Sequence, residues 1–218
     1  MLKTLQCFLV TLSQEANIIT NLVAHRVNTV AELRQLPRNY GAEIDVRAWR
    51  NELVLHHDPF QEGERFDDYL AEYEHSLLVV NIKETGIEAR ALEALRQRGI
   101  ADCFLLDVEF PYLYKASKKG ERAMAVRYSE VEGLDTVKQF EGVVDWTWID
   151  VNTSLPLDAN STGVLSRFRN CLVSPDLWGR PQDIPIYLQR MKELAFQPDA
   201  VVAKQSNLDA WNDLNERD

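Results

Sequence analysis

Eight short apolar runs, each followed by a stretch of helical character, limit the folds open to this sequence. The runs are centred on Leu22, Ile44, Leu78, Leu105, Val126, Ile149, Val173 and Val202. Unbroken apolar runs are typical of parallel strands that are buried on both faces, with helices as the connections between them. Eight such units predict an α/β protein whose strands close into a (β/α)8 TIM barrel. An open, doubly wound sheet is the alternative.

The length of the chain predicts one compact domain over residues 1–218. At 218 residues it is shorter than a typical barrel, so its helices and loops have to be short. The first 17 residues, MLKTLQCFLVTLSQEAN, contain an apolar run that is too short to span a membrane and lacks a clear cleavage pattern. We interpret this segment as a short N-terminal helix that covers one end of the core. No membrane span is expected elsewhere.

Charge and cysteine usage limit the partners and the compartment. The chain has 24 Lys and Arg against 34 Asp and Glu, a net charge of −10, so binding to nucleic acid is not expected. Cys7, Cys103 and Cys171 are far apart and show no CxxC spacing. They indicate reduced core thiols of a cytoplasmic protein rather than a disulfide framework. A catalytic cysteine is the alternative, which the apolar neighbours of all three disfavour.

Polar residues recur where the predicted strands end. These residues are His25, Arg26, Glu43, Asp45, Asn81, Lys83, Asp107, Glu109, Arg127, Asp150, Asn152, Asp176 and Lys204. Any one of them, taken alone, is more typical of a loop or a helix cap. In a barrel, however, the active site is built at the C-terminal ends of the strands, so the repeated pattern predicts a site there.

The stretch Gly41–Phe60, GAEIDVRAWRNELVLHHDPF, contains several candidate catalytic and metal-binding residues close together. Glu43 and Asp45 lie two apart in a predicted strand and therefore on the same face. Two adjacent carboxylates repel each other unless a proton or a cation lies between them, and oxygen ligands favour Mg²⁺ or Ca²⁺. The following hairpin ends in His56 and His57, side chains suited to proton transfer. The alternative is an amphipathic edge strand with a solvated acidic face.

The order of motifs in the first part of the chain resembles the glycerophosphodiester phosphodiesterases, one family of the phosphatidylinositol-phospholipase-C-like phosphodiesterase barrels. The segments that carry the resemblance are AHRVNTVAEL, GAEIDV, LVLHHDP and VVNIK. Order and spacing both agree up to Lys83. The rest of the chain fits only as general βα repeats, and VVAKQ replaces the Thr-Asp that usually ends the family's last strand. The resemblance is therefore that of a divergent member.

The resemblance implies a metal-dependent phosphodiester hydrolase, with a role in lipid metabolism and a small phosphodiester as substrate. Glu43, Asp45 and Asn81 stand at the family's metal-binding positions, for Mg²⁺ or Ca²⁺. His25 and His57 stand at the positions of the acid and the base, without a sign of which is which. Arg26 and Lys83 stand where the family binds phosphate. Additional candidates lie at the ends of later strands: Asp107, Glu109 and Trp178.

Departures from the family pattern keep other functions open. Asn81 replaces a metal-binding Glu, and Asp107 or Glu109 is the candidate to restore the lost charge. The loop after Arg26 lacks the family's Gly, and the stretch after Pro59 is short. The alternative is thus a catalytically impaired barrel that binds a phosphorylated small ligand. An unrelated barrel enzyme, such as a lyase or a sugar-phosphate isomerase, is disfavoured because the segments SPDLWGRPQD and AKQSNLD contain only one Gly.

Overall fold

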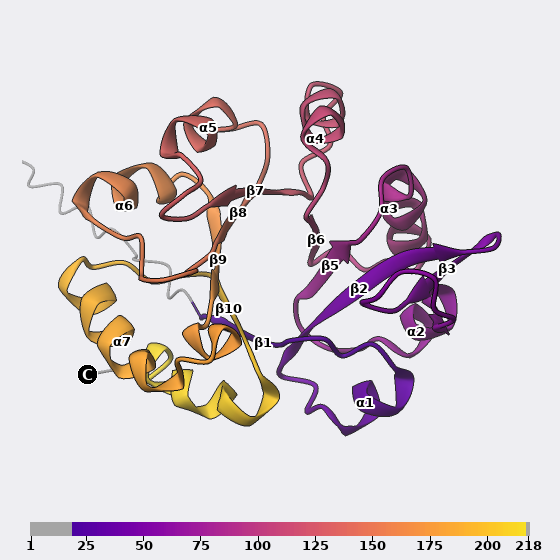
Figure 1. The fold of residues 1–218 in the computed structure, drawn as a ribbon, viewed down its shortest axis with the longest axis horizontal. Coiled ribbons are helices and arrows are strands. Elements are labelled where there is room, and N and C mark those ends of the chain that lie inside the picture. The colour runs from indigo at the N-terminus through magenta and orange to yellow at the C-terminus, as the bar shows by residue number, and fades with distance from the viewer. Residues whose placement is uncertain (1–18, 217–218) are drawn as a thin grey trace, which may run out of the picture.

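The computed structural model of the chain describes residues 19–216 and has a mixed α/β fold around one ten-stranded sheet (Figure 1). The expected N-terminal helix lies outside the described residues. Eight strands run parallel in the order β6-β5-β2-β1-β10-β9-β8-β7. They are β1 (Asn21–Ala24), β2 (Gly41–Trp49), β5 (Leu78–Ile82), β6 (Cys103–Leu106), β7 (Ala125–Tyr128), β8 (Trp146–Ile149), β9 (Arg169–Val173) and β10 (Ala200–Ala203). Each contains one of the eight predicted strand centres.

The two remaining strands form an antiparallel extension of β2. The strand β3 (Glu52–Leu55) pairs with the second half of β2, and β4 (Glu64–Arg65) pairs with β3. Figure 1 shows β2 and β3 running out beyond the ring of parallel strands. The strand β3 therefore ends before the two histidines, which lie in the loop that follows it.

The closed barrel is not confirmed, because β6 and β7 do not form a ladder. They meet in one isolated bridge between Leu105 and Met124, where the Leu105 N–H donates to the Ala123 carbonyl at 2.9 Å. Further along, side chains rather than backbones connect the two strand ends, through a 2.6 Å ion pair between Asp107 and Arg127. We call this edge of the sheet the β6–β7 seam.

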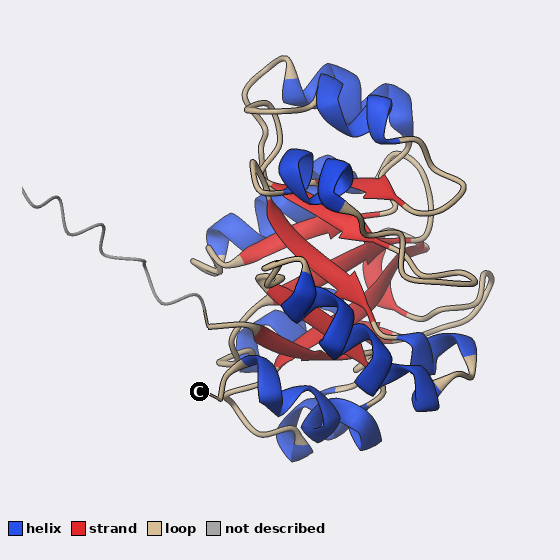
Figure 2. Ribbon diagram, turned by 90° about the vertical axis from the view of Figure 1, so that its left-hand side faces the viewer, coloured by secondary structure: helices blue, strands red, loops and turns tan. Residues whose placement is uncertain are grey.

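Helices surround the sheet (Figure 2), and residues 19–216 contain seven α-helices. They are α1 (Val30–Gln35), α2 (Phe66–Glu72), α3 (Glu88–Gln97), α4 (Phe110–Ser117), α5 (Leu134–Gln139), α6 (Ala159–Leu165) and α7 (Ile184–Glu193). Three 3-10 helices complete the described part: η1 (Pro175–Trp178), η2 (Pro181–Asp183) and η3 (Gln205–Leu214). Within residues 19–216, no helix has the length and apolar character that a membrane span requires.

The core fills the space between the helices and the sheet and the inside of the ring. Trp146 and Trp148 are buried there, and Trp146 stacks on Phe104 with ring centroids 4.5 Å apart. Cys103 and Cys171 are buried free thiols, which confirms the prediction for these two, while Cys7 lies outside the described residues. Glycine is required at Gly41, the first residue of β2, because a Cβ there would lie 2.3 Å from the Leu77 carbonyl oxygen.

Candidate functional site

The ends of β1, β2 and β5 bring together the residues expected to bind metal and phosphate. The parallel register places Asp45 opposite Asn81, and Glu43 lies two residues earlier on the same face of β2. Glu43, Asp45 and Asn81 are all buried. The charged ends of Arg26 and Lys83 approach the same carboxylates, so five of the predicted site residues form one cluster.

Both carboxylate oxygens of Glu43 accept hydrogen bonds. The backbone N–H of Arg26 donates to Oε2 at 2.8 Å, and the Asn81 amide donates to Oε1 at 3.0 Å. Burial raises the pKa of Glu43, and the charge of Asp45 raises it further. The two hydrogen bonds act to lower the pKa, but they do not cancel the rise. The amide of Asn81 thus binds Glu43 directly.

Asp45 is held by neutral and cationic donors. The Asn28 amide donates to Oδ2 at 2.9 Å, and the Asn28 carbonyl oxygen accepts from the Asp45 backbone N–H at 2.8 Å. Arg26 Nε lies 3.8 Å from Oδ2, and Lys83 Nζ lies 3.2 Å from Oδ1. Asn28 belongs to the AHRVNT motif, yet no role was assigned to it from sequence. Its position two residues after Arg26 was the only sign in the sequence that Asn28 could lie near the acids.

His25 lies at the edge of this cluster, with Nε2 3.8 Å from Oε2 of Glu43. Burial lowers the pKa of His25 to about 4, with a further contribution from Arg26, and the charge of Asp45 only partly opposes this shift. The imidazole is therefore neutral near pH 7 and available to accept a proton.

His57 is more exposed and belongs to the loop after β3. Its Nδ1 lies 2.8 Å from Oδ1 of Asp58, and this hydrogen bond is the main reason why the pKa of Asp58 is lowered. Because the ionised carboxylate only accepts, Nδ1 carries the proton and Nε2 is left for other partners. Arg26 contributes to the same lowered pKa, so Asp58 lies within electrostatic reach of the cluster.

Sequence reasoning missed Arg47, which fixes the position of the His57 loop. Its Nε and Nη2 donate to the His57 carbonyl at 3.0 and 2.8 Å, and its Nη1 donates to the Lys83 carbonyl at 2.9 Å. One guanidinium thus ties together the backbones that carry a candidate proton-transfer residue and a candidate phosphate-binding residue. The only sign of this role in the sequence was that Arg47 follows Asp45 by two residues and so lies on the same face of β2.

An ion-pair network continues from the cluster along the ends of β6, β7 and β8. Lys83 Nζ lies 3.9 Å from Asp107, and Asp107 pairs with Arg127. Arg127 also contacts Asp150 at 2.9 Å, and Asp150 accepts from the Trp178 indole N–H at 2.9 Å. The structure therefore joins Asp107 and Trp178 to the site.

Two other predicted residues, Glu109 and Lys204, do not bring their side chains to the acidic cluster. Glu109 is exposed at the N-terminus of α4, and it has no contact with the carboxylate pair in the part of the chain that the structure describes. The Lys204 side chain is exposed, and only its backbone N–H binds the buried Asp176. Asn207 donates to the same oxygen of Asp176 at 2.7 Å.

The acids and Asn81 fit a hard cation in donor type. Among residues 19–216, no group of three His, Cys, Asp or Glu side chains gathers as a metal site would require, so any site includes the Asn81 amide. The buried Oδ1 of Asn81 accepts no hydrogen bond, and neither does Oδ1 of Asp45, although Lys83 lies beside it. Two such oxygens next to Glu43 form an all-oxygen donor set of the kind that Mg²⁺ and Ca²⁺ prefer.

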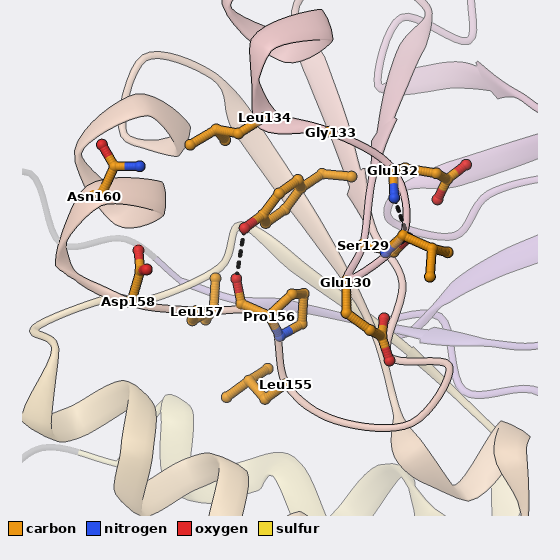
Figure 3. A pocket seen from close by; sticks show the side chains of 12 residues that line it. Ser129, Glu130, Glu132, Gly133, Leu134, Leu155, Pro156, Leu157, Asp158 and Asn160 are labelled. Carbon is orange, nitrogen blue, oxygen red and sulfur yellow. Dashed lines mark hydrogen bonds between the residues drawn. The ribbon is translucent and has the colours of Figure 1, made fainter.

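A separate hollow of about 550 Å³ lies between the loops after β7 and β8 (Figure 3). Its polar groups largely bind one another. Glu130 accepts hydrogen bonds from the backbone of Thr153 and Ser154, and Tyr128 donates to the Pro156 carbonyl at 2.8 Å. These contacts order the two loops, and we assign this hollow no chemistry.

Comparison with solved structures shows that the chain shares the fold of glycerophosphodiester phosphodiesterases. A protein from Agrobacterium tumefaciens strain C58 assigned as a glycerophosphoryl diester phosphodiesterase has a TM-score of 0.64 at 11% identity, covering 90% of this chain and 98% of its own. The glycerophosphodiester phosphodiesterase from the same strain has a TM-score of 0.63 at 14% identity, covering 88% and 100%. Searches of family profiles and curated sequences find no match. The resemblance in the sequence is thus confirmed at the level of the fold.

Proposed function

We propose that this chain is a metal-dependent phosphodiester hydrolase of the glycerophosphodiester phosphodiesterase type. The observation that carries the proposal is the cluster at the ends of β1, β2 and β5. There, two buried carboxylates and an amide oxygen adjoin a neutral histidine and two cationic side chains. A phosphodiester needs this combination, because the negative charge on its phosphoryl oxygens must be neutralised while one proton is removed from the attacking oxygen and another is delivered to the leaving oxygen.

Arg26 and Lys83 bind the phosphate in this proposal. The guanidinium presents a planar fork to two phosphoryl oxygens, and the ammonium acts as a point charge at the same group. Both already pair with Asp45, so the substrate exchanges one anionic partner for another. Glu43, Asp45 and Asn81 would hold Mg²⁺ or Ca²⁺, which supplies positive charge to the phosphoryl oxygens when bound.

The two histidines divide the proton transfers. His25 is the base, because its lowered pKa keeps the ring neutral and able to accept the proton of the attacking oxygen. His57 is the acid that donates to the leaving oxygen through Nε2, while Asp58 orients its ring through Nδ1. Arg47 keeps this loop next to Lys83 and therefore positions the acid relative to the phosphate.

The second candidate function is binding of a phosphorylated small ligand without turnover. Asn81 favours it, because this residue adds no negative charge and its amide donates to Glu43. A cation held by two charges instead of three binds more weakly. The cluster of Arg26 and Lys83 remains suited to phosphate in either case.

Hydrolysis assays with matched histidine variants test the proposal. We would assay bis(4-nitrophenyl) phosphate and glycerophosphocholine with Mg²⁺, Ca²⁺, Mn²⁺ or EDTA. His57→Asn should abolish metal-dependent turnover, whereas His56→Asn, the adjacent histidine, should retain it. The proposal is wrong if a folded protein turns over neither substrate with any metal. Phosphate binding that Lys83→Met abolishes would then support the binding function.

A further inference from the structure

A crevice of about 320 Å³ lies at the β6–β7 seam, between α4 and α5. Figure 1 shows these two helices on either side of the strand edge that the sheet leaves open. Side chains of β7, α4 and α5 and of the adjoining loops line the crevice, and five of them are apolar: Val108, Phe110, Leu113, Ala125 and Val126. The crevice therefore lies beside the two neighbouring strands that form no ladder with each other.

The crevice and the candidate site share residues. Asp107 and Arg127 line the inner end of the crevice, and Asp107 lies 3.9 Å from Lys83, the residue proposed to bind phosphate. A group attached to a phosphate held by Lys83 therefore has this apolar crevice close by. This continuity distinguishes the crevice from the hollow between the β7 and β8 loops.

Charges at the inner end of the crevice are already paired. Arg127 contacts Asp107 at 2.6 Å and Glu132 at 2.7 Å, so each of these lining groups has an ionic partner within the protein. A charged ligand group would have to break one of these pairs, whereas an apolar group leaves them intact. The chemistry of the walls thus selects an uncharged, apolar occupant.

The outer wall is built to stay open to solvent. The Phe110 side chain is 55% exposed, and its ring meets Phe140 edge-on, with centroids 5.8 Å apart and the planes at 88°. This contact connects the first turn of α4 with the end of α5 and bounds one side of the crevice. Exposed aromatic surface next to an apolar crevice is typical of small-molecule sites.

We propose that the crevice at the β6–β7 seam binds an apolar alcohol moiety of the substrate, an alkyl or aryl group esterified to the phosphate. The assignment rests on the proposed function for the position of the phosphate, and it names the substrate class. Glycerol, the small polar alcohol that the family resemblance implies, would leave the apolar walls unused.

Two phosphodiesters that differ only in this alcohol provide the test. Glycerophosphocholine and octylphosphocholine share the phosphate and the choline, and the second carries an eight-carbon chain. We would measure dissociation constants by calorimetry with the His57→Asn variant, below the micelle concentration of the octyl compound. Octylphosphocholine should bind at least 10-fold more tightly. Equal affinities, or tighter binding of the glycerol compound, would overturn the proposal.

A variant that fills the crevice locates the binding. Thr136→Trp on the exposed face of α5 should remove the preference for octylphosphocholine and leave glycerophosphocholine binding unchanged. Gln139→Trp, on the same helix but outside the crevice, should retain the preference. A preference that survives Thr136→Trp would place the alkyl chain elsewhere and reject the assignment.

Binding and turnover separate this inference from the proposed function. Octyl glucoside has the chain without the phosphate, and it should bind far more weakly than octylphosphocholine if the crevice and the phosphate site act together. Equal affinity of the two would disconnect the crevice from the phosphate site and overturn the inference, even if phosphodiesters are hydrolysed. Tight, Thr136-dependent binding of octylphosphocholine without any hydrolysis would retain the inference and reject only catalysis.

Discussion

Two residues at the mouth of the site have a backbone conformation that L-residues rarely adopt. Arg26 has a φ of 59° and Asp107 a φ of 54°. In this conformation the Arg26 N–H donates to Glu43 while the side chain approaches Asp45, so one residue contacts both acids. Such strain is typical of functional sites: Arg26 lies where we place the phosphate, and Asp107 lies beside Lys83.

Asn81 should limit the affinity of the site for a cation. Asn81→Asp adds a third carboxylate, next to Asp45, and we expect Mg²⁺ or Ca²⁺ to bind at least 10-fold more tightly, because the oxygens of a carboxylate attract a hard cation more strongly than an amide oxygen. The metal-induced rise in Tm and calorimetry both measure this. Asn81→Leu, which removes the oxygen, is the control and should show no metal-induced shift. If all three proteins respond equally, these residues do not form a metal site.

At the scale of elements, one side chain, Arg47, ties the loop after β3 to the end of β5. Arg47 lies on the part of β2 that pairs with β3, and its guanidinium reaches the carbonyls of His57 and Lys83. The alternation of β2 predicted the shared face of Glu43 and Asp45 correctly, because that face depends only on the period of the strand. The target of Arg47 could not be predicted, because it depends on where two loops that are distant in sequence come to lie.

Replacing Arg47 should loosen the His57 loop. Arg47→Met leaves two carbonyls without their charged donor and should lower the free energy of unfolding by about 1–3 kcal/mol. Arg47→Lys can restore only part of the forked contact, and we expect an intermediate effect. Denaturant unfolding measures the loss, and kcat should fall more than KM rises because the loop carries the proposed acid. Arg50→Met, in the same hairpin, is the control, and an equal loss there would remove the special role of Arg47.

The loop after β8 should depend on the ionisation of Glu130. Burial acts to raise the pKa of Glu130, but hydrogen bonds from Thr153 and Ser154 outweigh it and lower the pKa from 4.5 to about 2. The ionised form therefore stabilises the fold above about pH 4.5, and this contribution is lost as the pH falls through about 2. Glu130→Gln should cost about 1 kcal/mol at pH 7, because the group is largely exposed.

Unfolding of Glu130→Gln and the unaltered protein at several pH values checks the sign. The difference between the two should be largest near pH 7 and should shrink toward pH 2.5. A difference that stays constant over this range would mean that the effect of the substitution does not depend on the ionisation of Glu130.

For the whole molecule, the sequence predicted the eight parallel strands and their order along the chain. It did not predict that β6 and β7 fail to form a ladder. Apolar runs such as those around Leu105 and Val126 identify buried strands, because burial on both faces is a local property of composition. Pairing between β6 and β7 depends instead on how α4 and α5 pack around the seam. Nothing in the runs themselves distinguishes this pair from the ladder-forming pairs on the other side of the ring.

The β6–β7 seam should be the part of the sheet that opens most readily. Strands β6 and β7 each have a ladder on one side only, joined across the seam by the Leu105–Met124 bridge, whereas β1 and β10 are paired on both sides. Local opening costs least where backbone hydrogen bonds and buried contacts are fewest. Hydrogen exchange followed by mass spectrometry should therefore show faster exchange in peptides covering 103–107 and 124–128 than in those covering 21–24 and 200–203.

Octylphosphocholine should slow exchange at the seam if it occupies the crevice, and Thr136→Trp should remove this protection. Uniformly slow exchange in all four peptides would mean that the seam is as tightly closed as the laddered strands.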